Sequence, residues 1–186
     1  AEMGASAFHN PLQIVLEGGF GTLYNFQIDR FAWREGFDNL NETLRHPIDA
    51  IDAYGWKKFF WYEFVPHRGE GRNFVPNWTW HFIGLGMRNK LLEEYFRYHD
   101  YWQPTLLAWS SSYLLHYINE LIQASKFKET RGSVDAIPDL FFFDWAGALF
   151  FSFDAITDIT SGLLHMRDWS YQSQLNPVTR RLINNG

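Results

Sequence analysis

The residues of this sequence that could do chemistry are polar side chains set among apolar ones at helical spacing. Ser112, His116 and Glu120 follow one another at intervals of four, which places them on one face of a helix. A histidine beside a carboxylate can act as a general base, and the same pair can share a cation. Other candidates come from the segments before and after it: His81, Arg88 and Asp144.

Asp144 lies within the most apolar stretch of the chain, DLFFFDWAGALFFSFDAITD at 139–158. A carboxylate among aromatic side chains must be solvated, hydrogen-bonded, paired or neutralised, because burying it alone is costly. On a regular helix Asp144 shares one side with Gly147 and Ala148, and these small residues would let another backbone approach closely. We expect Asp139 to lie elsewhere, in the first turn of the helix. Two further aspartates on the side of Asp144 are expected to be solvated, Asp154 and Asp158.

Three interpretations of these residues remain open. The favoured one is a buried polar network that fixes the register of the helices, formed by His81, Arg88, Ser112, His116, Glu120 and Asp144. The second is a catalytic or ligand site, in which His81 or His116 is the base, Glu120 or Asp144 orients it, and Ser112 is the one candidate nucleophile on this face. The third is a metal shared by His116 and Glu120. No metal or cofactor is predicted, because the ferritin-type Glu-x-x-His pairs, HExxH, GxSxG and P-loop motifs are absent from the sequence.

Composition narrows the class of protein. The chain has a net charge of −5, which gives no electrostatic footprint for nucleic acid. Aromatic residues make up 19%, and such residues favour cores, interfaces and the headgroup level of membranes. Residues 101–119 are the nearest approach to a spanning helix, but they include Pro104 and three serines and are marginal for one. The small residue Ala1 suits a chain from which a signal peptide has been removed.

Prolines divide the sequence into helical segments. Helices are expected at 47–65, at 77–99 after Pro76, at 104–125, and from 138 to about 159 or beyond Gly162, with short connections. Gly18-Gly19 within residues 11–28 predicts a hairpin turn, or alternatively an irregular arm. The predicted class is therefore mainly α: a compact bundle of about four helices with strand-like or irregular terminal segments. The expected divisions are an N-terminal arm or hairpin (1–45), a helical domain (46–165) and a C-terminal extended segment (166–186) that continues past Gly186.

One aromatic cluster next to two lysines has the composition of a membrane-interface belt. It comprises Trp56, Phe59, Phe60 and Trp61 beside Lys57 and Lys58. Aromatic side chains with basic neighbours are typical of segments that lie at the headgroup level. The alternative is ordinary core packing with two lysines whose charged ends reach water.

Three motifs occur in an order that resembles the VanZ-like and YfiM-like superfamily. They are HFIGLG at 81–86, INELIQ at 118–123 and RGSVDAIPDLFFFDWAGALFF at 131–151, and the resemblance covers about residues 77–155. His81, Glu120, Asp144, Gly147 and Ala148 match the family's pattern. The spacing from Asp139 to Asp144 is one residue longer than that pattern. The resemblance implies a compact helical unit at or in a membrane, without an established reaction.

The favoured function is a membrane-associated helical scaffold, or an accessory subunit of a bacterial cell-envelope assembly, rather than an enzyme. The alternative is an enzyme that modifies a lipid or envelope polymer, or a lipid-binding protein, using His81, His116, Glu120 and Asp144. Membrane lipid and envelope proteins are the expected partners, and nucleic acid is not. The expected location is the outer membrane or the periplasmic face of the membrane.

Overall fold

The protein is mainly helical. The computed structural model describes residues 10–21, 32–66, 73–126 and 132–163, with two short strands at 174–175 and 182–183. The described residues form eight continuous helices, so the mainly-α prediction is confirmed and the number of helices was predicted too low. In chain order they are α1 (Pro11–Phe20); α3 (Trp33–Arg45); α4 (Pro47–Tyr54); α5 (Trp56–Phe64); α6 (Phe74–Pro76), η2 (Asn77–Leu85) and α7 (Gly86–Tyr98) as one; α8 (Pro104–Lys126); α9 (Gly132–Pro138), η3 (Asp139–Phe143) and α10 (Asp144–Phe151) as one; and α11 (Asp154–Asp158) with η4 (Ile159–Leu163).

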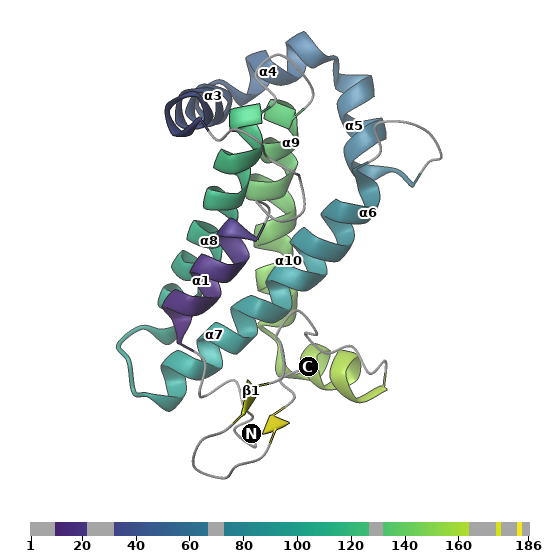
Figure 1. The fold of residues 1–186 in the computed structure, drawn as a ribbon. Coiled ribbons are helices and arrows are strands. Elements are labelled where there is room, and N and C mark those ends of the chain that lie inside the picture. The colour runs from purple at the N-terminus through teal and green to yellow at the C-terminus, as the bar shows by residue number, and fades with distance from the viewer. Residues whose placement is uncertain are drawn as a thin grey trace.

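Two long helices form the centre of the arrangement. α8 runs beside the helix α9–η3–α10, and α1 packs along α8 (Figure 1). The helix α6–η2–α7 crosses both: η2 and α7 pack against α10, and α7 also packs against α8 (Figure 1). α3 lies across one end of the arrangement (Figure 1). Three long segments of the chain therefore meet where η2, α8 and η3–α10 come together.

The predicted hairpin at Gly18-Gly19 is wrong, because residues 11–20 form the helix α1. Asn10 caps it by accepting a hydrogen bond from the backbone N–H of Leu12 at 2.9 Å, and Pro11 occupies the first turn. The two glycines serve close packing instead of a turn. A Cβ on Gly18 would overlap the side chain of Leu115 on α8, and a Cβ on Gly19 would meet Ile118.

The extra helices have local causes. Residues 33–45 look polar and turn-rich, yet they form α3, whose Leu40 is fully buried in a cluster with Leu121 and Leu140. Gly55, with a φ of 97°, divides the predicted helix 47–65 into α4 and α5. A break at Ser152 and Phe153 ends α10 before the predicted limit at residue 159.

Two glycines allow the crossing that brings η2 and α7 against α10. A Cβ on Gly86 would lie 2.6 Å from the carbonyl oxygen of Gly147, and a Cβ on Gly147 would collide with the carbonyl of Phe82. The expectation that Gly147 and Ala148 admit a neighbouring backbone is confirmed, since both are buried at this contact. The crossing therefore fixes where the functional side chains of η2 lie, along the helix axis, relative to those of α10.

The terminal segments are only partly described. The strands β1 (Gln174–Leu175) and β2 (Leu182–Ile183) pair antiparallel, with Gln174 opposite Ile183. The rest of the extended segment expected at 166–186 lies outside the described residues, as does most of the second half of the predicted hairpin. None of the described helices combines the length with the apolarity that crossing a bilayer requires.

Candidate functional site

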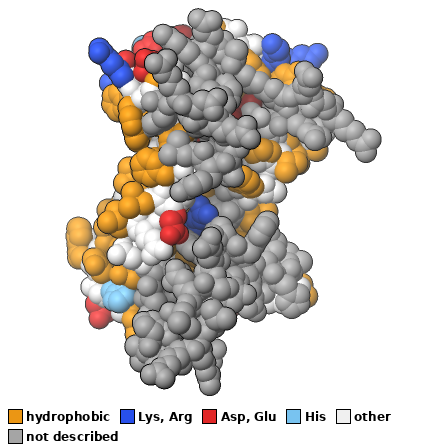
Figure 2. Space-filling model, viewed as in Figure 1, with side chains coloured by type: hydrophobic (Ala, Val, Ile, Leu, Met, Phe, Trp, Pro, Cys, Tyr) orange, Lys and Arg blue, Asp and Glu red, His pale blue; other side chains and the backbone are white. Residues whose placement is uncertain are grey.

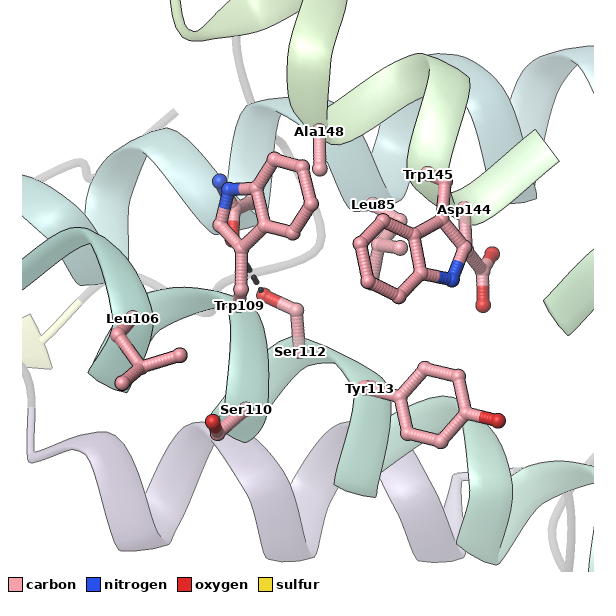
Figure 3. Close-up of a pocket in the computed structure, with 10 residues that line it drawn as sticks. Leu85, Leu106, Trp109, Ser110, Ser112, Tyr113, Asp144, Trp145 and Ala148 are labelled. Carbon is pink, nitrogen blue, oxygen red and sulfur yellow. Dashed lines mark hydrogen bonds between the residues drawn. The ribbon is translucent and has the colours of Figure 1, made fainter. Parts of the chain in front are cut away.

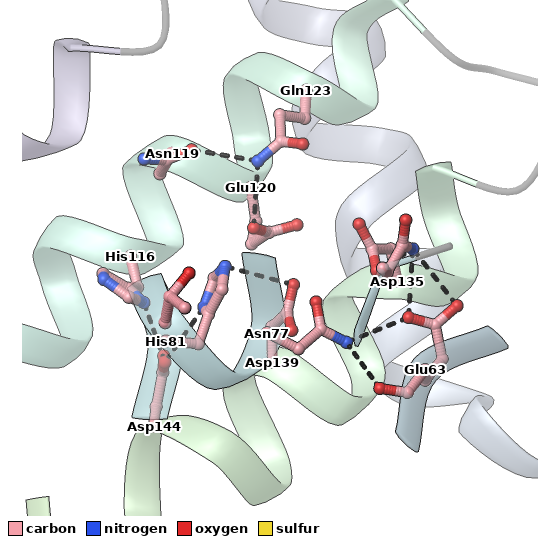
Figure 4. Close-up of polar contacts among 12 residues, drawn as sticks. Glu63, Asn77, His81, His116, Asn119, Glu120, Gln123, Asp135, Asp139 and Asp144 are labelled. Carbon is pink, nitrogen blue, oxygen red and sulfur yellow. Dashed lines mark hydrogen bonds and ion pairs between the residues drawn. The ribbon is translucent and has the colours of Figure 1, made fainter. Parts of the chain in front are cut away.

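The polar residues converge on one buried carboxylate. Asp144, at the start of α10, lies 3.1 Å from Nδ1 of His81 on η2 and 2.8 Å from Nδ1 of His116 on α8, in both cases through Oδ1 (Figure 4). The two imidazole rings stand edge to face with centroids 4.6 Å apart. The side chains are almost wholly buried, at 3% exposed for Asp144 and 5% for His116. One carboxylate thus joins three separate segments of the chain.

Charge is distributed unevenly over these three residues. Burial acts to raise the pKa of Asp144, but His116 and His81 outweigh it and the pKa is lowered, so the group is an acceptor-only carboxylate. Each histidine must then carry a hydrogen on Nδ1. Burial lowers the pKa of His116, whereas the hydrogen bond and charge of Asp144 leave the pKa of His81 raised despite its burial. Of the two imidazoles, that of His81 therefore binds a second proton more readily.

The other nitrogen of His81 faces two more acids. Nε2 lies 3.3 Å from Oδ2 of Asp139, and the carboxylate of Glu120 lies beside both (Figure 4). One donor atom each from His81, Glu120 and Asp139 fall within 4.8 Å of one another. Glu120 also accepts a hydrogen bond from the amide of Gln123 at 3.2 Å. We call His81, His116, Glu120, Asp139 and Asp144 the acid–histidine centre.

A π-helical turn is the reason that Asp139 belongs to this centre. In a regular α-helix, residues five apart are offset by about 140° around the axis, so Asp139 and Asp144 would face different ways. Residues 139–143 instead form η3, in which the N–H of Asp144 bonds to the carbonyl of Asp139. This i→i+5 pattern stacks the two residues on one face. The prediction that Asp139 lies elsewhere is wrong because it assumed α-helical spacing throughout.

Two acids of the centre have raised pKa values. The pKa of Glu120 is raised to about 7, mainly by burial and further by the charges of Asp144 and Glu63. The charge of His81 acts in the opposite direction but is smaller than these effects together. Burial and the neighbouring acids also raise the pKa of Asp139 well above the usual range. Three acids of the centre each have a buried oxygen with no hydrogen-bond partner in the described structure: Oε2 of Glu120, Oδ1 of Asp139 and Oδ2 of Asp144.

A second cluster of buried acids adjoins the first, and its hydrogen-bond partners are amides instead of imidazoles. Nδ2 of Asn77 donates to Oε2 of Glu63 at 3.0 Å, and Nδ2 of Asn73 donates to both Glu63 oxygens at 3.2 and 3.0 Å (Figure 4). Asn73 also donates to Asp135, whose pKa is raised well above normal, by burial first and then by Glu63. We call Glu63, Asn73, Asn77 and Asp135 the amide clamp. It ties α5 to α6, η2 and α9.

The structure brings together four of the six residues of the predicted network. His81, His116, Glu120 and Asp144 lie in the centre, as the helical spacing suggested. Ser112 is buried but donates its hydroxyl to Oδ1 of Asn89 at 3.2 Å, so it faces an amide and not a histidine. Arg88 is half-buried with its guanidinium beside Gly18 of α1, and it acts on the centre by helping to lower the pKa of His116. Asp154 and Asp158 are exposed, as expected, and Asp154 pairs with Lys90.

Sequence reasoning missed Asp139 and the whole amide clamp. One signal was present: Asp135 and Asp139 are four residues apart, which places two acids on one helical face next to the phenylalanine-rich stretch. No comparable signal marks Glu63, because it lies among exposed aromatic residues and its burial depends on the helix that begins at residue 74.

A cavity adjoins the centre on the side of Asp144. It has a volume of about 250 Å³ and lies between α8, α7 and α10 (Figure 3). Its walls are mainly apolar and aromatic, with Trp109, Tyr113 and Trp145 among them. Burial and the charge of Asp144 raise the pKa of the Tyr113 hydroxyl. A ligand in this cavity would touch the carboxylate that holds both histidines.

The chemistry open to this arrangement is proton transfer or cation binding. His81 and Asp144 form a hydrogen-bonded base and carboxylate, and beside them lie Glu120, whose pKa is raised to about 7, and Asp139, whose pKa is also raised by burial. A serine nucleophile is not supported, since Ser112 has no histidine as hydrogen-bond partner in the described structure. No protein-family model matches the chain, and neither the curated proteins nor the solved structures include a match to it.

Proposed function

We propose that the protein is a helical scaffold or accessory subunit that binds the surface of a membrane. The observation that carries the proposal is an extended apolar surface, which we call the aromatic face. Each of its residues is at least 40% exposed: Trp56, Phe60, Trp61, Phe141, Phe142, Trp145, Leu149, Phe150 and Phe153. Exposed apolar surface of this extent is a mark of a binding surface for membrane or protein.

Ring contacts make the face continuous across helices. On α5 the rings of Phe60 and Phe64 are 5.7 Å apart, and Phe64 in turn lies 5.2 Å from Phe142 on η3. Farther along, Phe150 on α10 lies 5.4 Å from Phe82 on η2. The face therefore joins two segments that are distant in the sequence, α5 and η3–α10, and it borders η2.

The composition of the face favours lipid headgroups. Tryptophan and phenylalanine settle at the boundary between headgroups and acyl chains, and Lys57 and Lys58 on α5 add positive charge beside them. Phe59 must be removed from the predicted belt, because it is 4% exposed and packs with Ile51 and Val134. On the side drawn in Figure 2, hydrophobic side chains also occupy the middle of the surface, and most of the charged side chains in view lie towards the end with α3, α4 and α5.

The resemblance of residues 77–155 to VanZ-like and YfiM-like proteins supports a setting in the bacterial cell envelope, at the outer membrane or in the periplasm. In this proposal the partners are membrane lipid and envelope proteins. The acid–histidine centre then holds η2, α8 and α10 in register behind the aromatic face.

Vesicle flotation tests the proposal. The triple variant Phe60→Ser, Trp61→Ser and Trp145→Ser should bind vesicles of zwitterionic and anionic phospholipid at least about tenfold more weakly than the wild type, because less apolar area is buried. A matched control alters three equally exposed residues on α1 and α3: Leu12→Ser, Trp33→Ser and Phe37→Ser. Equal binding by both triple variants, or no binding by the wild type, would contradict the proposal.

A second candidate is a lipid-binding protein or an enzyme acting on a lipid or envelope polymer, and the cavity is the observation that favours it. Two buried donors that help to line it, Nδ2 of Asn89 and Nε1 of Trp109, have no hydrogen-bond partner in the described structure. An amphiphile with an ester or phosphate oxygen would satisfy these donors and fill the apolar volume. Native mass spectrometry should then detect lipid bound to the wild type, and less of it bound to Trp109→Phe, which removes the donor and keeps most of the ring.

A further inference from the structure

We propose that His81, Glu120 and Asp139 bind one divalent transition-metal ion, of the class of Zn²⁺ or Mn²⁺. The ligands would be Nε2 of His81 and one oxygen from each acid, which already lie within 4.8 Å of one another. Metal–ligand distances of about 2.0–2.2 Å require only a modest contraction of this set. The proposal departs from the sequence-based expectation of no metal, and it does not depend on membrane binding.

The orientation of His81 is that of a metal ligand. Its Nδ1 is held by the carboxylate of Asp144 at 3.1 Å, which leaves Nε2 directed at Asp139 and Glu120 (Figure 4). A carboxylate behind the imidazole is the usual outer partner of a metal-bound histidine, because it fixes the ring and strengthens its basicity. Asp144 is therefore a positioning residue in this site and not a ligand.

Both acids have buried oxygens that nothing in the described structure satisfies. Glu120 and Asp139 are each 1% exposed, and Oε2 of Glu120 and Oδ1 of Asp139 lack a hydrogen-bond partner. An unsatisfied buried acceptor is costly, and two acids at one point repel each other when ionised. A divalent cation would remove both penalties at once.

The neighbouring groups do not offer an equivalent site. His81, His116 and Asp144 are also close together, but both Nδ1 atoms point at the same oxygen of Asp144 and carry hydrogens there. In the amide clamp, the oxygens of Glu63 are occupied by the amides of Asn73 and Asn77. Among the described groups, the set on the Nε2 side of His81 combines a ring nitrogen that Asp144 does not hold with two carboxylates that each have an oxygen lacking a hydrogen-bond partner.

The donor set indicates the class of ion. One imidazole and two carboxylates suit zinc, manganese or ferrous iron. Calcium prefers about six to eight oxygen ligands, which this set does not supply. Three protein ligands leave at least one position on the ion for water or a substrate.

The test uses the full chain after removal of metal with a chelator. Zn²⁺ alone and Mn²⁺ alone are titrated by calorimetry at pH 8, and bound metal is counted by elemental mass spectrometry. We expect about one ion per chain, and an affinity at least about 100-fold lower in Glu120→Gln and in Asp139→Asn. Asp144→Asn should lower the affinity about 10- to 100-fold and still reach the same stoichiometry.

Asp135→Asn is the matched control, since it changes an acid of the adjacent amide clamp that is outside the ligand set. It should bind the ion as the wild type does. The amide variants keep the shape of the neutral acids and should fold, which circular dichroism and the melting temperature without metal will show. A wild type that binds neither ion, or Glu120→Gln and Asp139→Asn variants that bind as tightly as the wild type, would overturn the proposal.

Discussion

The amide clamp and the acid–histidine centre are adjacent buried clusters of acids, but their partners differ. In the clamp, the amides of Asn73 and Asn77 donate to Glu63, and both oxygens of Glu63 accept hydrogen bonds. In the centre, Asp139 and Asp144 are paired with imidazoles, which can gain or lose a proton, Glu120 accepts from the amide of Gln123, and one oxygen remains without a partner on each of these three acids. An acid whose oxygens accept hydrogen bonds from amides is suited to a structural role. An acid that is paired with an imidazole, or that keeps an oxygen without a partner, can still exchange protons or bind a cation.

The largest effect expected from this contrast is on the pH dependence of stability in the metal-free protein. The pKa of Glu120 rises from 4.5 in the unfolded chain to about 7 in the fold. An acid with a raised pKa in the fold stabilises the folded state least once it is ionised, so stability should fall as pH increases from 4.5 to 7. Glu120 alone accounts for about 3 kcal/mol of that loss. Urea unfolding at several pH values, with chelator present, measures it.

Other groups of the two clusters modify this profile in known directions. Asp139 and Asp135, with raised pKa values, act in the same sense as Glu120, and so does His81, whose stabilisation is lost as pH rises through its raised pKa. His116 opposes them, because its lowered pKa favours the fold at higher pH. The lowered pKa of Asp144 matters only in more acidic solution, below 3.8. Glu120→Gln should flatten the profile, and an unchanged slope would show that Glu120 is not the main titrating group.

Next in size is the loss of an amide from the clamp. Asn77→Leu removes the donor to the side chain and the backbone carbonyl of Glu63 and leaves a buried acid with fewer partners. It should lower the free energy of unfolding by about 2–3 kcal/mol. Asp139→Asn in the centre, also nearly isosteric, should cost much less in the metal-free protein. If the two variants are equally unstable, the distinction between the clusters fails.

A smaller effect is expected at the glycine crossing that aligns the centre. Gly147→Ala introduces a Cβ that collides with the carbonyl of Phe82, so η2 and α10 must move apart. We expect a loss of about 1–3 kcal/mol, as for other overpacked contacts. The change should also disturb the pairing of His81 with Asp144, which the NMR signals of the histidine ring would report. Gly162→Ala is the control, because nothing lies within 4 Å of a Cβ there.

The smallest effect is expected where an acid is exposed. The side chain of Asp154 is 85% exposed, and it pairs with Lys90, whose side chain is 12% exposed and also donates to the carbonyl of Ser152; the hydrogen bond and charge of Lys90 lower the pKa of Asp154. The exposed carboxylate contributes little because water and salt screen its charge. Asp154→Asn should leave urea unfolding unchanged within error, at low and at high salt. A clear loss would mean that exposure is a poor guide to the role of acids in this protein.

Helical spacing predicted the part of the site that regular α-helices build. Intervals of four placed His116 and Glu120 on one face of α8, and a carboxylate inside an apolar stretch identified Asp144 as a residue that needs partners. Prolines correctly marked the starts of α4 and α8. These signals depend only on residues that are close together in the chain, so they can be recognised from the sequence alone.

The missing parts depend on contacts between distant segments. α3 is polar in composition and is held as a helix by the packing of Leu40 on α8, which no local pattern shows. Gly18-Gly19 has the sequence of a turn, and only the side chains of α8 reveal it as a close approach of two helices. Glu63 follows the residues of the predicted belt, and only the amides of Asn73 and Asn77, which come from a later segment, explain why it is buried.

The π-helical turn η3 sets how residues 139–144 tolerate insertions and deletions. That turn absorbs a fifth residue between Asp139 and Asp144 without separating them. A regular α-helix with the two acids four residues apart would keep the same pair of side chains on one face. Deleting Leu140 should therefore leave the acid pair in place, whereas inserting a residue at this turn would rotate α10 out of phase with His116.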